Sequence, residues 1–373
     1  MSRETIFAAS VEYFLSPILP FLRDPTVTEV MVNRFDQVYV ERGGRLYKTD
    51  AKFASDDALL SAVHNVAQWV GRRIDELQPV LDARLPNGSR VHAILPPGCR
   101  NGTCLTIRKF KAGGMTLDDL IGYGSLNEAA AEFLQLCVRL HKNIVVSGGT
   151  GTGKTSLLNA MSTAIPEEER IVVIEDTSEL RLNQEHVVYL EVQKPDPQGR
   201  GGLTIRQLFV ASLRMRPDRI VVGEVRGGEA LDMIQAMLSG HTGSLTTVHA
   251  NTTRDALTRL ETLSLMSDVS LPVYVARAQV AAAVQLIVQL GRFSEDGSRR
   301  VTRISEVLGL GADQQYQLRD LYVLRMRGRD AQGQLVGELE ATGEQPTFAS
   351  EPLEQGLLDR VKASRPLWRL TPM

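Results

Sequence analysis

Gly148-Gly149-Thr150-Gly151-Thr152-Gly153-Lys154-Thr155 is the stretch of this sequence that decides its fold. It fits the pattern G-x-x-x-x-G-K-[ST], a phosphate-binding loop that joins a strand to a helix. The apolar residues 143–147 predict that strand, and residues 154–164 predict the helix. Glycines let the backbone turn its N–H groups inward, where the amides and the helix N-terminus bind phosphate oxygens. The stretch therefore predicts a nucleotide site on an α/β domain.

The residues of the loop have separate expected roles. Lys154 would neutralise the charge of the β- and γ-phosphates, and the Thr155 hydroxyl would hold Mg²⁺. A glycine-rich turn without a ligand is the alternative, but the Lys-Thr pair directly after a strand favours the nucleotide. The predicted ATP-binding set is Gly148, Gly149, Thr150, Gly151, Thr152, Gly153, Lys154, Thr155 and Ser156.

Composition sets outer limits on the class of protein. A chain of 373 residues is long enough for about two domains, and 43% hydrophobic with 23% charged residues is typical of a folded protein. The net charge of −2 gives no overall basic signature of nucleic-acid binding. The three cysteines form no Cys-x-x-Cys pair, which favours reduced thiols in the cytosol. Polar residues interrupt the most apolar later segment, 273–290, so we expect no transmembrane helix.

The pattern of strands and helices predicts two domains. Residues 1–112 are expected to form an α/β N-terminal domain, and residues 113–126 a linker. In the domain 127–373, short apolar strands alternate with helices, which predicts a mostly parallel sheet covered on both faces. After residue 284 the pattern becomes strand-rich, and residues 331–350 read as a polar loop.

A carboxylate ends one of the predicted strands of the second domain. Residues 220–222 are apolar, Gly223 stands where many P-loop enzymes carry an Mg²⁺-binding Asp, and Glu224 follows. A carboxylate at that tip can orient and polarise an attacking water. An ordinary solvated glutamate at the end of a strand is the alternative.

A second acidic group follows the strand at 171–175. Glu175 and Asp176 are expected at the carboxyl edge of the sheet, which faces the ligand crevice in open α/β folds. Asp176 could hold Mg²⁺ through water and so compensate for the missing Asp, whereas Glu175 is the second candidate for the catalytic base. An acidic loop without a function is the alternative.

Two histidines bracket the strand at 244–249. His241 and His249 beside a P-loop and a glutamate favour a role in sensing the γ-phosphate, although histidines satisfied in the core are common. Ligation of a metal is disfavoured because no third ligand stands near them in the sequence.

Arginines form the last candidate set. A planar guanidinium that reaches the γ-phosphate stabilises developing charge, and a neighbouring subunit often supplies it. Arg214 ends a helix shortly before Glu224, which predicts that both lie near one edge of the sheet. For each arginine an ordinary surface position is the alternative. The candidates are Arg84, Arg90 and Arg108 in the first domain, and Arg206, Arg214, Arg216 and Arg226 in the second.

Taken together, these motifs resemble the secretion ATPase superfamily, the motors of type II secretion, type IV pili and type IV secretion. The P-loop, the acidic box 175–179, the Glu224 strand and the histidine box 240–251 match in order. Residues 81–91 (LDARLPNGSRV) and 105–110 (LTIRKF) look like the branch that assembles tight-adherence (Tad) pili, the CpaF type. The likeness covers residues 25–328.

The resemblance implies a RecA-like P-loop ATPase domain with a smaller α/β N-terminal domain, in a homohexameric ring. ATP would bind between the two domains of one subunit. Glu224 would be the catalytic glutamate, and His241 and His249 the histidine-box residues. Arg90 and Arg108 would reach the nucleotide from the N-terminal domain, and Arg214 would approach from the next subunit.

The function that the resemblance implies is a Mg²⁺-dependent ATPase motor for a Tad-type pilus or a related secretion machine. It would lie in the cytoplasm, peripheral at the inner membrane, beside platform proteins of that machine. A type IV secretion ATPase that moves DNA or effector proteins is the alternative within the superfamily. An ATP-dependent assembly switch and a small-substrate kinase are the alternatives outside it.

Overall fold

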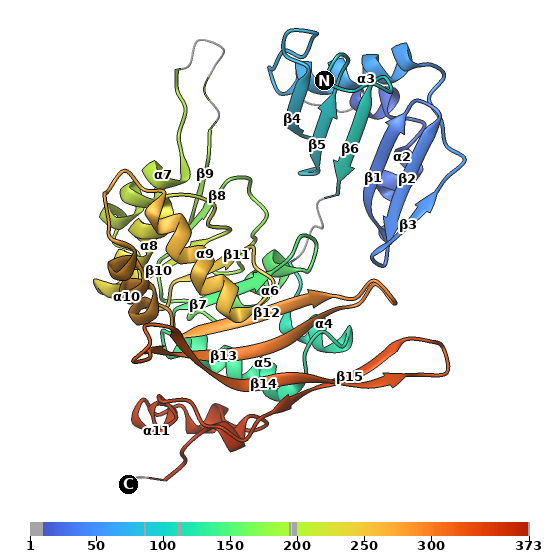
Figure 1. The fold of residues 1–373 in the computed structure, drawn as a ribbon. Coiled ribbons are helices and arrows are strands. Elements are labelled where there is room, and N and C mark those ends of the chain that lie inside the picture. Colours follow the sequence, from blue (N-terminus) through green and yellow to red (C-terminus); the bar gives the residue numbers. More distant parts are fainter. Residues whose placement is uncertain (1–9, 86, 110–113, 194, 196–199, 372–373) are drawn as a thin grey trace. The chain divides into compact units, whose positions relative to one another are not determined.

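The computed structural model describes residues 10–85, 87–109, 114–193, 195 and 200–371 of the chain. The chain divides into two compact units, Met1–Ala112 and Gly113–Met373 (Figure 1). Each unit has its own sheet and its own hydrophobic core, and each is described by itself.

The described residues of the first unit form an antiparallel six-stranded sheet in the order β3-β2-β1-β6-β5-β4. Ser55 caps the helix α3 by accepting a hydrogen bond from the Ala58 N–H, and the apolar side of this helix shares a core with one face of the sheet. The other face is mostly polar. The elements are α2 (Leu19–Arg23), β1 (Val27–Arg34), β2 (Gln37–Arg42), β3 (Arg45–Lys48), α3 (Asp56–Trp69), β4 (Val80–Arg84), β5 (Arg90–Ile94) and β6 (Cys104–Arg108).

The second unit is built on a nine-stranded sheet in the order β15-β14-β13-β12-β7-β11-β10-β8-β9. The six strands from β12 to β9 run parallel, whereas β13, β14 and β15 continue the sheet as antiparallel neighbours. The strands are β7 (Ile144–Gly148), β8 (Ile171–Glu175), β9 (Val187–Glu191), β10 (Arg219–Val222), β11 (Leu245–Val248), β12 (Leu286–Arg292), β13 (Arg299–Leu310), β14 (Tyr316–Arg329) and β15 (Leu335–Ala341).

Helices cover both faces of the parallel part of this sheet, which is why every residue of β7, β8, β10 and β11 is buried (Figure 1). On β7, Ile144 and Val146 face the core under α4 (Leu117–Gly122), α5 (Glu128–Arg139) and α6 (Lys154–Ser162). Val145 faces the opposite core. That second core lies under α7 (Ile205–Ser212), α8 (Glu229–Leu238), α9 (Thr253–Leu265) and α10 (Val273–Ala283).

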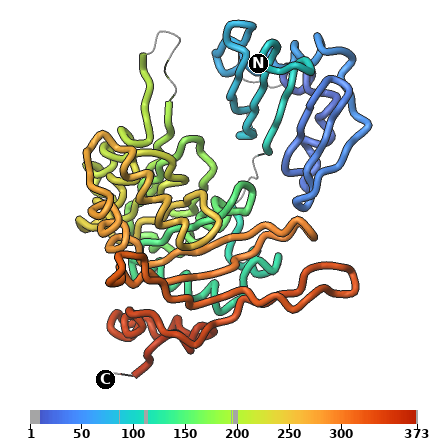
Figure 2. The backbone as a smooth tube through the Cα atoms, viewed as in Figure 1, coloured from blue at the N-terminus to red at the C-terminus, as the bar shows by residue number. Residues whose placement is uncertain are grey.

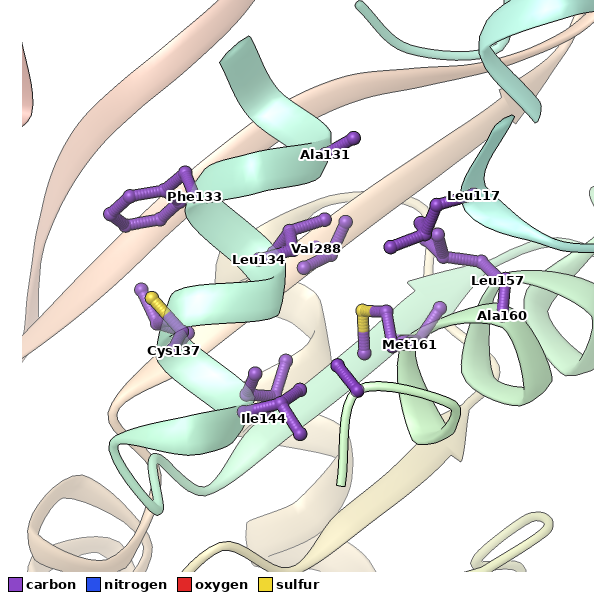
Figure 3. Close-up of a cluster of buried hydrophobic side chains, with 14 of the residues drawn as sticks. Leu117, Ala131, Phe133, Leu134, Cys137, Ile144, Leu157, Ala160, Met161 and Val288 are labelled. Carbon is purple, nitrogen blue, oxygen red and sulfur yellow. The ribbon is translucent and has the colours of Figure 1, made fainter. Parts of the chain in front are cut away.

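The core beneath α4, α5 and α6 joins helices from both sides of the P-loop in sequence (Figure 3). Leu134 of α5, Met161 of α6 and Val288 of β12 are each fully buried there. Burying a Leu, Met or Val side chain contributes roughly 1.5–3 kcal/mol, so this packing fixes α6 and the loop before it.

The C-terminal segment, drawn in red in Figure 2, contacts the side chains of α5. The ring centroids of Trp368 and Phe133 lie 5.2 Å apart. The Glu132 carboxylate accepts backbone hydrogen bonds from residues 362–364. Short elements in the unit are η1 (Leu213–Met215), α11 (Glu351–Glu354), η2 (Leu358–Arg360) and η3 (Arg365–Leu367).

Two expectations about the second unit are wrong. The expected linker 113–126 contains α4, which Thr116 caps and whose Leu117 and Leu120 are buried in the core. The expected polar loop 331–350 contains β15, which pairs with β14 along its whole length. No helix in the described part of the chain is long and apolar enough to cross a membrane.

Candidate active site

The P-loop closes tightly between β7 and α6. Gly151 and Gly153 have φ of 69° and 94°, a backbone conformation that other residues rarely adopt. The Thr152 hydroxyl donates to the Gly149 carbonyl at 2.9 Å. A Cβ atom at Gly148 would lie 2.5 Å from that hydroxyl, so the loop has no room for a side chain there. These constraints explain the glycines that the motif requires.

Lys154, the first residue of α6, is 8% exposed and turns back over the loop. Its Nζ atom donates to the Gly149 carbonyl at 3.0 Å and lies 3.3 Å from Nε2 of His249. The ammonium therefore sits in the concavity of the loop, where phosphate charge would be bound.

Glu224 and His249 meet Lys154 at the same edge of the sheet. The His249 Nε2 atom lies 3.1 Å from Oε1 of Glu224, and the other carboxylate oxygen accepts a hydrogen bond from Arg226 Nε at 2.8 Å. Three strands bring these groups together, because β7, β10 and β11 are parallel and their carboxyl ends share one edge. Glu224 Oε1 is buried and accepts no hydrogen bond of good geometry from the described residues.

Burial and a neighbouring ammonium favour the neutral form of the His249 imidazole. Burial lowers its pKa, the Lys154 ammonium lowers it further, and the opposing effect of Glu224 is smaller. A neutral imidazole can hydrogen bond without adding a second positive charge beside Lys154.

Glu175 explains why Gly223 replaces the expected Asp. Its carboxylate is 4% exposed and accepts backbone hydrogen bonds from Glu179 at 2.8 Å and Leu180 at 3.0 Å. A Cβ atom at Gly223 would lie 2.9 Å from Cγ of Glu175, so the side chain fills the space beside that glycine. These two hydrogen bonds hold the segment that follows β8 against the Glu175 carboxylate.

Thr155 and Asp176 are the residues expected to hold a Mg²⁺ ion. Asp176 lies at the carboxyl end of β8, and its Oδ2 atom is 3.3 Å from an Arg226 nitrogen. The described residues contain no cluster of three His, Cys, Asp or Glu side chains that could hold a metal. This donor set fits a Mg²⁺ ion whose ligands are mainly phosphate oxygens and water.

His241 and Arg214 lie at the opposite edge of the sheet. His241 precedes β11 and hydrogen bonds to the end of α8, whereas His249 follows β11. Arg214 is exposed in η1 before β10, and Glu224 follows that strand. The expectation that Arg214 and Glu224 share an edge is therefore wrong, because a complete strand separates them. The trans role of Arg214 stays a prediction.

Arg90 and Arg108 belong to the first unit. They are direct partners on β5 and β6, and Arg84 of β4 and Glu29 of β1 continue the same row across the sheet. The row lies on the face away from α3. Their approach to the nucleotide stays a prediction.

Two arginines beside the P-loop were missed by the sequence analysis. Arg299 Nε donates to the Gly151 carbonyl at 2.7 Å. A Cβ atom at Gly151 would lie 3.3 Å from a terminal nitrogen of Arg292. Both arginines come from the β12–β13 hairpin, and only the position of β12 next to β7 brings them to the loop.

A P-loop on a parallel sheet, with a carboxylate on a nearby strand end, is the arrangement typical of P-loop nucleotide-binding proteins. Residues 13–319 match the family described as type II/IV secretion system protein, and the chain belongs to this family. The expected superfamily is thereby confirmed.

Named relatives support that membership. A putative conjugal transfer protein of Mycobacterium tuberculosis is 38% identical over 292 residues, which are 77% of this chain and 82% of the relative. The type IV secretion system protein VirB11 of Brucella suis is 35% identical over 329 residues, which are 80% of this chain and 90% of VirB11.

A solved structure supports the fold. The ATPase DotB of Legionella pneumophila has a TM-score of 0.54 and 18% identity, with coverage of 83% of this chain and 80% of DotB. This likeness agrees with the expected RecA-like α/β class.

Proposed function

We propose that this protein is a Mg²⁺-dependent ATPase that works as a ring and powers a type IV secretion or related pilus machine. The contiguous contacts Lys154–His249–Glu224 at the carboxyl edge of the sheet carry the proposal. They place a cation suited to bind phosphate, an imidazole and a carboxylate in successive contact beside the P-loop.

Each residue has a defined part in hydrolysis. The loop amides and Lys154 would bind the β- and γ-phosphates, and Thr155 and Asp176, the latter through water, would hold Mg²⁺, which neutralises phosphate charge when bound. Glu224, oriented by Arg226, would position a water with its carboxylate and accept its proton. His249 lies between Lys154 and Glu224, so it would respond to whether a γ-phosphate is present. This geometry favours turnover over a pure binding switch.

The ring accounts for the arginines that lie outside this cluster. Arg214 would stabilise transition-state charge on a neighbouring subunit, and Arg90 and Arg108 would contact nucleotide from the N-terminal unit. Such a ring would act in the cytoplasm, at the inner membrane, against platform proteins.

A mixing experiment tests the ring. Lys154→Ala subunits and Arg214→Ala subunits are each expected to be inactive, and a mixture should regain part of the ATPase activity. Recovery is expected because an intact P-loop can meet an intact Arg214 at a mixed boundary. A mixture of Lys154→Ala with Glu224→Gln is the control, since neither subunit then has a complete site. No recovery from mixtures shown to co-assemble would contradict the trans role.

The cargo has two candidates. Transfer of protein or DNA is favoured by relatives named for type IV secretion and conjugal transfer. Assembly of a Tad pilus is favoured by residues 81–91 and 105–110. In cells that carry Glu224→Gln, loss of macromolecular transfer with normal surface pili would support the first candidate. Loss of pili with normal transfer would support the second.

A further inference from the structure

The two flanks of the P-loop strand carry different chemistry. β7 lies between β11 and β12 in the sheet. On the β11 side the loop meets His249 and then Glu224, the groups suited to act on a γ-phosphate. On the β12 side it meets Arg292 and Arg299, which are register partners on the β12–β13 hairpin.

The side chains on the two flanks of the loop determine the orientation in which a nucleoside triphosphate would bind. Its γ-phosphate must lie near Lys154 and within reach of a water at Glu224, which is toward β11 and β10. The nucleoside is at the other end of the phosphate chain, so it must leave the loop away from these groups. The β12–β13 hairpin occupies that flank.

The hairpin is attached to the loop and offers a planar group there. Arg299 donates to the Gly151 carbonyl at 2.7 Å, which ties the hairpin to the tip of the P-loop. Arg292 is exposed, and a terminal nitrogen lies 3.3 Å from the position of a Cβ atom at Gly151. A guanidinium is planar and stacks on aromatic faces, which suits a purine ring.

We infer that the β12–β13 hairpin is the nucleoside side of the site, with Arg292 stacking on the base and Arg299 positioning the loop. The inference rests on the proposed nucleotide function and adds the residue that contacts the nucleoside. It implies that Arg292 distinguishes a nucleotide from a bare polyphosphate, whereas Lys154 does not.

The test compares the binding of ATP with the binding of inorganic tripolyphosphate, which has no nucleoside, to the full-length protein. Arg292→Ala should weaken ATP binding about threefold to thirtyfold, the range of a cation–π contact, and leave tripolyphosphate binding unchanged. Arg292→Lys should restore only part of the loss, because it keeps the charge without the plane. Arg325→Ala, an exposed arginine of β14, is the control and should change neither affinity.

The outcomes separate the two proposals. An equal loss for ATP and tripolyphosphate would make Arg292 a phosphate ligand and overturn the inference. No loss for either ligand would also overturn it. If the unaltered protein bound neither ligand, or if Lys154→Ala left both affinities intact, the proposed nucleotide function would fail instead.

Discussion

The two edges of the parallel sheet carry the same kinds of side chain and use them differently. At the carboxyl edge, Lys154 has a carbonyl and a neutral imidazole beside it, and Glu224 keeps a buried oxygen without a hydrogen bond from the described residues. At the amino edge, Arg219 is 1% exposed and forms an ion pair with Glu169. The two clusters therefore differ at their carboxylates: Glu169 is bonded to Arg219 through both oxygens, whereas only one oxygen of Glu224 accepts a hydrogen bond from the described residues.

The amino-edge cluster is closed on itself. Nε2 of His141 lies 3.3 Å from Glu169, and Arg219 also donates to the Gly243 carbonyl at 3.4 Å. A Cβ atom at Gly243 would lie 2.0 Å from an Arg219 nitrogen, so the glycine makes room for the guanidinium. These contacts tie the segments before β7, β8 and β11 to the first residue of β10, which is a structural role.

The largest effect should come from a substitution at the carboxyl edge of the sheet. Lys154→Ala is expected to weaken ATP binding about 10³-fold, because losing one partner of a buried charge contact costs several kcal/mol. The free energy of unfolding should stay within about 1 kcal/mol of the unaltered protein. Isothermal calorimetry and denaturant unfolding measure the two quantities. Unchanged ATP affinity would show that this edge is not the phosphate site.

A substitution at the amino edge should instead lower the stability of the protein and leave ATP turnover unchanged. Glu169→Ala leaves the buried Arg219 charge without its ion-pair partner and should destabilise the protein by about 3 kcal/mol. ATP turnover per folded molecule should not change, because no nucleotide contact is lost. Glu168→Ala, an exposed neighbour, is the control. A large loss of turnover at full stability would give the amino edge a catalytic role and break the comparison.

A smaller effect is expected on the stability of the protein at acidic pH. Burial alone would raise the pKa of Glu169, but hydrogen bonds from His141 and Arg219 and the charge of Arg219 outweigh it and lower the pKa to about 2. A lowered pKa stabilises the folded state above the unfolded value of 4.5, and this contribution is lost as the pH falls from 4.5 toward 2.

After solvent screening we expect a contribution on the order of 1–2 kcal/mol from Glu169. Unfolding free energies measured between pH 5 and pH 2 should therefore fall more steeply for the unaltered protein than for Glu169→Ala, by about that amount. Parallel curves for the two proteins would mean that this pair does not link stability to pH in that range.

Many of the candidate site residues at the carboxyl edge of the sheet could be predicted from the sequence. The P-loop is a local pattern. Glu224 lies two residues beyond β10 and His249 lies directly after β11, so the parallel strands had to bring both to one edge. The predicted position of Arg214 was wrong because it was based on closeness to Glu224 in the sequence. The strand β10 runs between the two residues and separates them by its full length.

Other features depend on long-range pairing that no local pattern reveals. Arg299 and Gly151 are 148 residues apart in the chain and meet only because β12 lies beside β7. The strand β15 lies within a polar stretch of the sequence and pairs along its length with β14. Gly122 and Gly124 led to the prediction of a linker where the structure has the α4 helix. The buried side chains of Leu117 and Leu120 hold this helix in the core.

The proposal that Glu224 is the general base for ATP hydrolysis is tested by measuring the rate of ATP turnover of Glu224→Gln. The substitution keeps the size of the side chain and removes its ability to accept a proton from water. We predict that ATP binding is retained and that turnover falls at least ~10²-fold, the usual scale for losing a general base. Turnover near that of the unaltered protein, with ATP still bound, would contradict the account and make Glu175 the next candidate for the base.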